Sequence, residues 1–156
     1  MKYLAIALAL FALPTMASED IPDQYPGSVL YSKPVEFIPG VYSAIGATAP
    51  PTYENAGHNN NLSFIVTGEG VVVVNGGASY LLAKALHAEI KAVTDQPVVL
   101  VFNENGQGHA MLGNSYWKDQ GVKIVAQAEA AAEFEEYGGQ SLRAAQATVR
   151  ERADQT

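Results

Sequence analysis

His109 is the side chain in this sequence whose surroundings fit chemistry best. It follows the glycine-rich run Asn103-Glu104-Asn105-Gly106-Gln107-Gly108, which comes directly after a continuous apolar segment. An imidazole in a glycine-lined cleft can serve as a metal ligand or as a general base. The alternative is a histidine that caps a short helix. No second histidine lies within metal-ligand spacing, and a zinc site needs three or more ligands together.

Other residues add little to this chemistry. His58, in an asparagine-rich loop, could approach His109, and Glu104 is either a carboxylate partner for His109 or an exposed loop glutamate. We expect the side chain of His87 to be solvated, because it lies one residue beyond the apolar stripe of the helix that is predicted after Ser79. The chain has no cysteine, which excludes a disulfide framework, a thiolate nucleophile and a cysteine-type zinc site.

Two further kinds of site find weak support. Gly106 and Gly108 match the first two glycines of a dinucleotide-binding turn, but Met111 stands where the third glycine is required. No serine has the Gly-x-Ser-x-Gly context of a serine hydrolase.

The elements that would position these residues alternate between strands and helices in the second half of the chain. The predicted strands are residues 35–38, 41–45, 62–67, 71–74, 98–102 and 122–126. Ser79 fits the N-cap of a helix with an apolar stripe of Leu82, Leu86, Ile90 and Val93. Further helices are predicted around residues 111–117, at 129–137 up to Gly138-Gly139, and at 141–152. Residues 47–61 read as a long surface loop. Strands that alternate with helices predict parallel neighbours.

Residues 61–77, with the sequence NLSFIVTGEGVVVVNGG, resemble the opening of the metallo-β-lactamase fold family, and the helix, strand and glycine loop that follow are similar too. The resemblance covers residues 35–137 and looks most like the exported metallohydrolase branch associated with quinoprotein systems. It implies an α/β fold: the first half of an αββα sandwich, with a mixed sheet and flanking helices.

The resemblance also implies where a zinc site would lie. In the family, a loop of pattern His-x-His-x-Asp-His binds one or two zinc ions. The two leading histidines correspond here to Asn105 and Gln107, the aspartate to His109 and the third histidine to Ala110, while the aspartate of the family's first turn is Asn75. Neutral amides are poor zinc ligands and do not supply the charge that helps a metal acidify bound water. We therefore expect weak or absent zinc binding, with zinc as a cofactor only if the site persists in altered form.

The chain ends after what resembles the first half of the family fold. Half a sandwich exposes the inner face of its sheet, and a bare apolar face normally signals a partner. The expected partner is a second half-domain or another copy of the chain, unless the chain is a truncated product. The residues do not identify a small-molecule substrate.

The N-terminus predicts export. Lys2, the apolar run 3–13 and the small residue Ala17 match a cleavable signal peptide over residues 1–17, and the apolar run is too short to span a bilayer. We expect a flexible leader at 18–33, a partial metallo-β-lactamase-like domain at 34–156, no membrane span after cleavage, and a periplasmic or secreted location. The net charge of -7 argues against nucleic acid as a partner.

Three functions remain open at this point. The favoured one is an exported protein related to zinc hydrolases, with little or no zinc hydrolase activity alone. The second is an active metal-dependent hydrolase that uses a different ligand set around His109 and His58 or is completed by a partner chain. The third is a periplasmic binding or interaction module.

Overall fold

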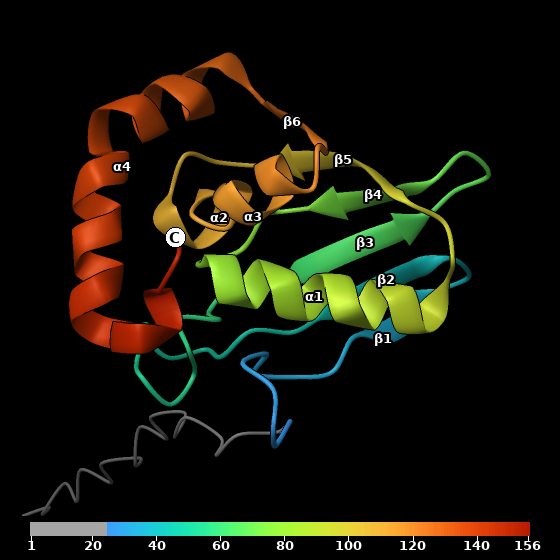
Figure 1. Cartoon of the computed structure of the whole chain (residues 1–156), viewed down its shortest axis with the longest axis horizontal. Helices are drawn as coiled ribbons and strands as arrows, with labels where there is room; N and C mark the ends of the chain where they lie inside the picture. The colour runs from blue at the N-terminus through green and yellow to red at the C-terminus, as the bar shows by residue number, and fades with distance from the viewer. Residues whose placement is uncertain (1–24) are drawn as a thin grey trace, which may run out of the picture.

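A computed structural model describes residues 25–156, in which a mixed sheet carries helices against it (Figure 1). The predicted signal peptide and residues 18–24 of the predicted leader lie outside the described residues. The strands are β1 (Val35–Ile38), β2 (Val41–Ala44), β3 (Leu62–Val66), β4 (Val71–Val74), β5 (Val98–Asn103) and β6 (Lys123–Ala126). The helices are α1 (Tyr80–Val93), α2 (Gly108–Met111), α3 (Asn114–Asp119), α4 (Ala128–Val149) and the short 3-10 turn η1 (Arg150–Ala153).

The six strands lie in the sheet in chain order. β1 to β4 pair antiparallel, whereas β4, β5 and β6 are parallel. α1 makes the connection between β4 and β5, and α2 and α3 make the one between β5 and β6. The predicted α/β class, a mixed sheet with flanking helices and parallel neighbours in the second half, is confirmed.

α1 packs on the sheet through the face that the sequence predicts. Its N-cap Ser79 accepts a hydrogen bond from the Leu82 N–H (3.1 Å), and Leu82, Leu86 and Ile90 are buried against the sheet. Val93, the last residue of the predicted stripe, is 43% exposed because the helix ends there. Leu82, Leu86 and Ile90 form the main core together with Trp117 of α3 and apolar strand residues such as Phe64 and Val73.

The strand register defines a second face of the sheet. Tyr42, Phe64, Val73 and Val101 lie opposite one another on the helix-covered face. Because strand side chains alternate, their neighbours lie on the other face. We call this the open sheet face, and it comprises Val41, Ser43, Ser63, Ile65, Val72, Val74, Leu100, Phe102, Lys123 and Val125. In Figure 1, α1, α2 and α3 lie in front of the sheet, and Phe102 on the open sheet face is 40% exposed.

Two predictions about helices are wrong. The C-terminal region forms one helix, α4, that runs through Gly138-Gly139 without a break. Gly138 leaves room for the Phe134 ring, since a Cβ there would lie 3.1 Å from it. The single short helix predicted around residues 111–117 is two, because the chain turns at Gly113, whose N–H donates to the Gly77 carbonyl (2.7 Å).

Two segments predicted to lie on the surface contribute to the interior. In the predicted leader, Leu30 and Tyr31 are buried. In the predicted surface loop, Asn55 and His58 are buried, and the Asn55 amide accepts from the N–H groups of Thr52 and Gly57. These hydrogen bonds satisfy the loop backbone without water, which removes the main cost of burying it. Within residues 25–156, no helix has both the length and the hydropathy needed to cross a bilayer.

Replacing Gly139 with alanine should stabilise the protein. Gly139 is helical, and a Cβ there would make only an ordinary contact, 3.6 Å from the Arg143 guanidinium. We expect Gly139→Ala to raise the free energy of unfolding by about 0.5–1 kcal/mol in urea denaturation. The matched change Gly138→Ala should gain less, because its methyl meets Phe134. Equal gains in both variants would contradict the packing described for Phe134.

Candidate functional site

The ends of β4 and β5 are joined by asparagine side chains. Asn75 follows β4 in a left-handed conformation (φ 69°), which asparagine tolerates better than most residues. Its Nδ2 donates to the Glu104 carboxylate (3.1 Å), and its Oδ1 accepts from the Glu104 N–H (3.2 Å). Both polar atoms of Asn75 are therefore used within the protein.

Asn103 continues this arrangement below the surface. Its side chain is fully buried, its Oδ1 accepts from the Gly76 N–H (2.9 Å), and its Nδ2 donates to Asn114 Oδ1 (3.1 Å). The Trp117 indole N–H donates to the Gly76 carbonyl (3.0 Å). We call Asn75, Asn103, Glu104 and Asn114 the amide network. It links the two strand ends to α3.

Sequence reasoning did not single out Asn103 or Asn114. The available signal was the position of Asn103 at the end of an apolar parallel strand, where a polar side chain meets the neighbouring strand end.

The loop between β5 and α2 lies directly beneath α4. Asn105 Oδ1 accepts from the Gln107 N–H (2.9 Å), a local turn that holds the loop backbone. A Cβ at Gly106 would overlap the Ala130 carbonyl and come within 2.7 Å of the Glu133 side chain, and one at Gly108 would lie 3.0 Å from Ser141. The glycines of this loop thus allow α4 to pack against it.

His109 lies in the first turn of α2 and is half-buried. Desolvation lowers the pKa of its imidazole, and the charge of Glu104 acts in the opposite direction. The hydrogen bonds of the Glu104 side chain and N–H go to Asn75, so the carboxylate is a structural partner of the amide network. His109 lies beside α4, in the lining of a cavity with Ser141 and Ala145.

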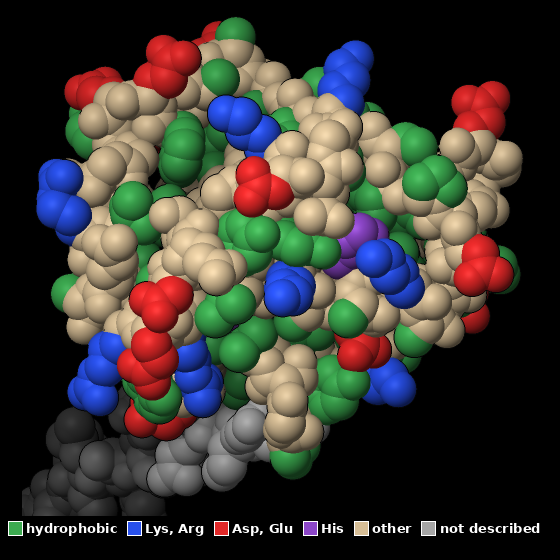
Figure 2. Space-filling view, in the orientation of Figure 1, with side chains coloured by type: hydrophobic (Ala, Val, Ile, Leu, Met, Phe, Trp, Pro, Cys, Tyr) green, Lys and Arg blue, Asp and Glu red, His purple; other side chains and the backbone are tan. Residues whose placement is uncertain are grey.

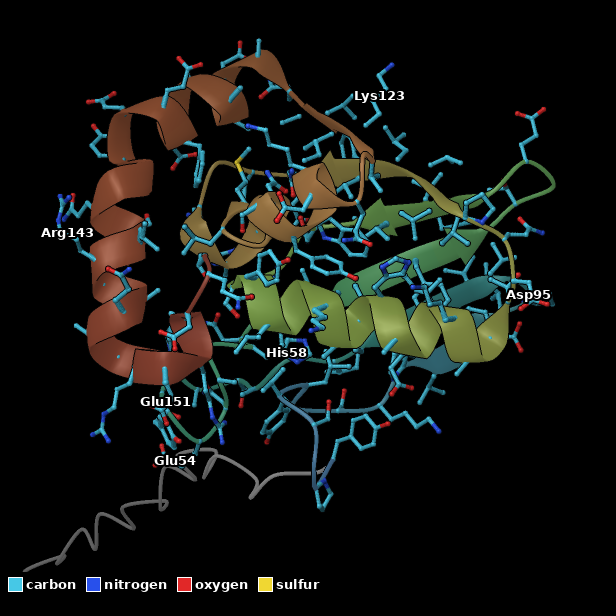
Figure 3. The ribbon with its side chains drawn as sticks, in the orientation of Figure 1. Glu54, His58, Asp95, Lys123, Arg143 and Glu151 are labelled. Atoms are coloured by element: carbon cyan, nitrogen blue, oxygen red, sulfur yellow. The ribbon has the colours of Figure 1, made fainter. Side chains whose placement is uncertain are left out.

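His58 is held in a different arrangement. It is fully buried, and its Nδ1 accepts a hydrogen bond from the Tyr31 N–H (2.9 Å), so that nitrogen carries no proton. Burial lowers the pKa of the imidazole from 6.5 to about 4, while backbone hydrogen bonds with Ala44 and Asn60 oppose the shift. Figure 3 shows His58 within the body of the domain, where it fastens the segment before β1 to the loop before β3.

The prediction that His87 is solvated is wrong. The side chain is 9% exposed, its Nδ1 lies 2.7 Å from the Tyr116 hydroxyl, and its ring packs 5.3 Å from that of Trp117. Desolvation and then the Lys91 charge lower its pKa. The buried side of α1 is wider than the stripe of Leu82, Leu86 and Ile90 alone. His87 lies on this side and therefore faces the core.

No model of a known protein family matches this chain. Solved structures do match. A metallo-β-lactamase from Erythrobacter litoralis, with β-mercaptoethanol in its active site, aligns with a TM-score of 0.54 and 15% identity over 67% of this chain and 45% of its own. The mono-zinc form of the metallo-β-lactamase FIM-1 from Pseudomonas aeruginosa aligns with a TM-score of 0.55 and 13% identity over 67% of this chain and 46% of its own. The chain has about half of the metallo-β-lactamase fold.

The residues that the sequence resemblance assigns to the zinc-loop positions do not form a set of zinc ligands. Asn105 and Gln107 offer neutral amides, and the Asn105 oxygen already accepts a backbone hydrogen bond. Ala110 has no ligand atom, which leaves His109 as the one imidazole of the loop. Across residues 25–156, no three His, Asp or Glu side chains come together as a metal site would require.

The His58 arrangement predicts that acid destabilises the protein. The folded state holds His58 neutral down to about pH 4, whereas an unfolded chain takes up the proton near pH 6.5. Stability should therefore be level above pH 6.5 and fall by up to about 3 kcal/mol as the pH drops towards 4. Urea denaturation between pH 4.5 and 8 measures this dependence.

A matched pair of variants separates His58 from the other histidines. In His58→Asn the amide oxygen can still accept from Tyr31 but cannot titrate in this range, so the slope below pH 6.5 should flatten. His109→Asn should keep most of the slope. An unchanged slope in His58→Asn would show that His58 is not the group responsible.

Proposed function

We propose that this chain is an exported metallo-β-lactamase-fold protein that does not act as a zinc hydrolase alone and serves instead as a binding module. The observation that carries the proposal is the use of the zinc-loop region for internal contacts. Asn75 and Asn105 are hydrogen-bonded within the protein, and α4 packs on Gly106 and Gly108. A hydrolytic zinc needs three protein ligands and an open position for water, and this loop offers one imidazole as a ligand.

Metal content tests the proposal. The mature chain, loaded with zinc and dialysed, should retain well below one zinc per chain by mass spectrometry, because one imidazole and two amides form a weak site. His109→Ala should change this content little. Stoichiometric zinc that disappears in His109→Ala would support the alternative, a hydrolase with a non-standard ligand set, and would refute our proposal.

The open sheet face supports a further part of the proposal, a second half-domain as partner. The aligned metallo-β-lactamases extend well beyond the matched region, since the match spans 45–46% of each. The open sheet face is made of valine, isoleucine, leucine and phenylalanine around two serines, with Lys123 on the edge strand β6, and its apolar part favours a dry contact with another apolar sheet. We propose that such a half-domain, on the same or another polypeptide, covers this face.

Without that cover, the chain should associate through the open sheet face. We expect the isolated mature chain to run as an oligomer in size-exclusion chromatography with light scattering, and to bind the dye ANS, because a continuous apolar face is bare. Phe102→Lys should shift it to monomer and lower ANS binding. Val93→Lys is the control, since Val93 is similarly exposed (43% against 40%) but lies at the end of α1. A wild-type monomer that binds no ANS would contradict the assignment.

Export is the remaining part of the proposal and rests on the sequence of residues 1–17. In a bacterial host with a periplasm, intact-mass measurement should find a chain that begins just after Ala17 in the periplasmic fraction. Leu8→Arg interrupts the apolar run and should leave the uncleaved chain in the cytoplasm. A full-length wild-type chain that stays in the cytoplasm would refute export.

A further inference from the structure

Between α4 and the rest of the domain lies a partly open cavity of about 230 Å³, which we call the α4 cavity. One wall is the α4 face that bears Ser141, Ala145 and Val149. The opposite wall comes from α2, with His109 and Leu112, and from the loops that carry Gly57 and Ala78.

Contacts in η1, directly after α4, tie this end of the helix to the loop that lines part of the cavity. The Tyr53 hydroxyl donates to the Glu151 carboxylate (2.6 Å), and the Arg152 guanidinium lies 4.3 Å from the Tyr53 ring and donates to the Tyr53 carbonyl (2.7 Å). We call these residues the C-terminal clasp. Figure 3 shows Glu54 and Glu151 at the same end of α4, and Figure 2 shows acidic and basic side chains gathered there. The clasp fixes α4 over the loop that carries Gly57.

The lining indicates what kind of molecule the α4 cavity accepts. Among residues 25–156, the side chains that line it are apolar or neutral, and none is Lys, Arg, Asp or Glu. The Thr148 hydroxyl donates to the Ala144 carbonyl of its own helix (2.8 Å), so it is already engaged. The half-buried His109 imidazole contributes the ring nitrogens of the lining, and desolvation lowers its pKa, which favours the uncharged form. A neutral imidazole offers one donor and one acceptor.

The volume of the α4 cavity limits the size of the molecule that it can bind. A dry cavity of about 150 Å³ lined by apolar side chains holds benzene. The α4 cavity is larger, with about 230 Å³, which leaves room for a ring with a small substituent. Charged or strongly polar molecules would lose their hydration without gaining a charged partner.

We propose that the α4 cavity binds a small uncharged molecule the size of a substituted benzene ring, whose single hydroxyl or carbonyl group hydrogen-bonds to His109. The ring lies against Leu112, Ala145 and Val149, and the polar group points to α2. This binding needs no metal and is independent of the partner on the open sheet face, so the zinc and association experiments do not decide it.

Binding of toluene, p-cresol and benzoate to the unmodified mature chain tests the ligand chemistry. In methyl NMR titrations, toluene and p-cresol should produce saturable shifts at Ala78 and Val149, two cavity residues on opposite walls. The p-cresol dissociation constant should be about three- to tenfold lower, the change expected from one neutral hydrogen bond. Benzoate should produce no saturable shift at these residues. The absence of shifts with both neutral probes, or a preference for benzoate, would overturn the proposal.

Variants locate the site. Ala145→Phe fills the α4 cavity and should weaken toluene and p-cresol binding at least tenfold, whereas Ala147→Phe, exposed on the same helix, should leave it unchanged. His109→Ala should keep toluene binding and remove the preference for p-cresol. Undiminished binding in Ala145→Phe would overturn the assignment. If Ala145→Phe does not fold, the shifts at Ala78 and Val149 in the unmodified chain still decide between binding and no binding.

Discussion

The hydrogen bonds of the buried Asn103 side chain determine how the ends of β4, β5 and α3 meet. One amide accepts from Gly76 and donates to Asn114, so a strand end, a turn and a helix are held by a single side chain. A buried amide is stable only when its donors and acceptors are paired, which makes this geometry specific. The close approach of Gly76 to Gly113 and the Trp117 indole bond to Gly76 depend on the same placement.

The loop between β5 and α2 takes part in the same internal packing. Both polar side-chain atoms of Asn75 form hydrogen bonds with Glu104. The loop that follows β5 has no side chains at Gly106 and Gly108, which lets α4 approach its backbone closely. α4 occupies the space above those glycines. The result is a packed interface on one side and the α4 cavity on the other, with His109 between them.

The sequence predicted the sheet well because periodicity and turn residues act locally. The run of four valines, the Ser79 cap and the Pro39-Gly40 turn each depend on neighbours within a few residues, and each appears in the structure. Predictions from the sequence were wrong where contacts between distant residues override local conformational preference. Gly138-Gly139 continues α4 because Phe134 packs over Gly138, and His58 is buried because Tyr31, distant in the sequence, supplies a donor. The amide network escaped detection for the same reason, since its partners are brought together only by the parallel strands.

The central claim is that asparagine hydrogen bonds occupy the place where zinc ligands lie in the fold's hydrolases. A titration of the ¹⁵N-labelled chain with zinc, followed through side-chain amide and imidazole resonances by NMR, tests it most directly. Our account predicts that the Asn75 and Asn103 amides stay fixed and that Asn105, Gln107 and His109 show no joint, saturable shift. A coordinated shift of those three residues, complete at one equivalent of zinc, would contradict the account.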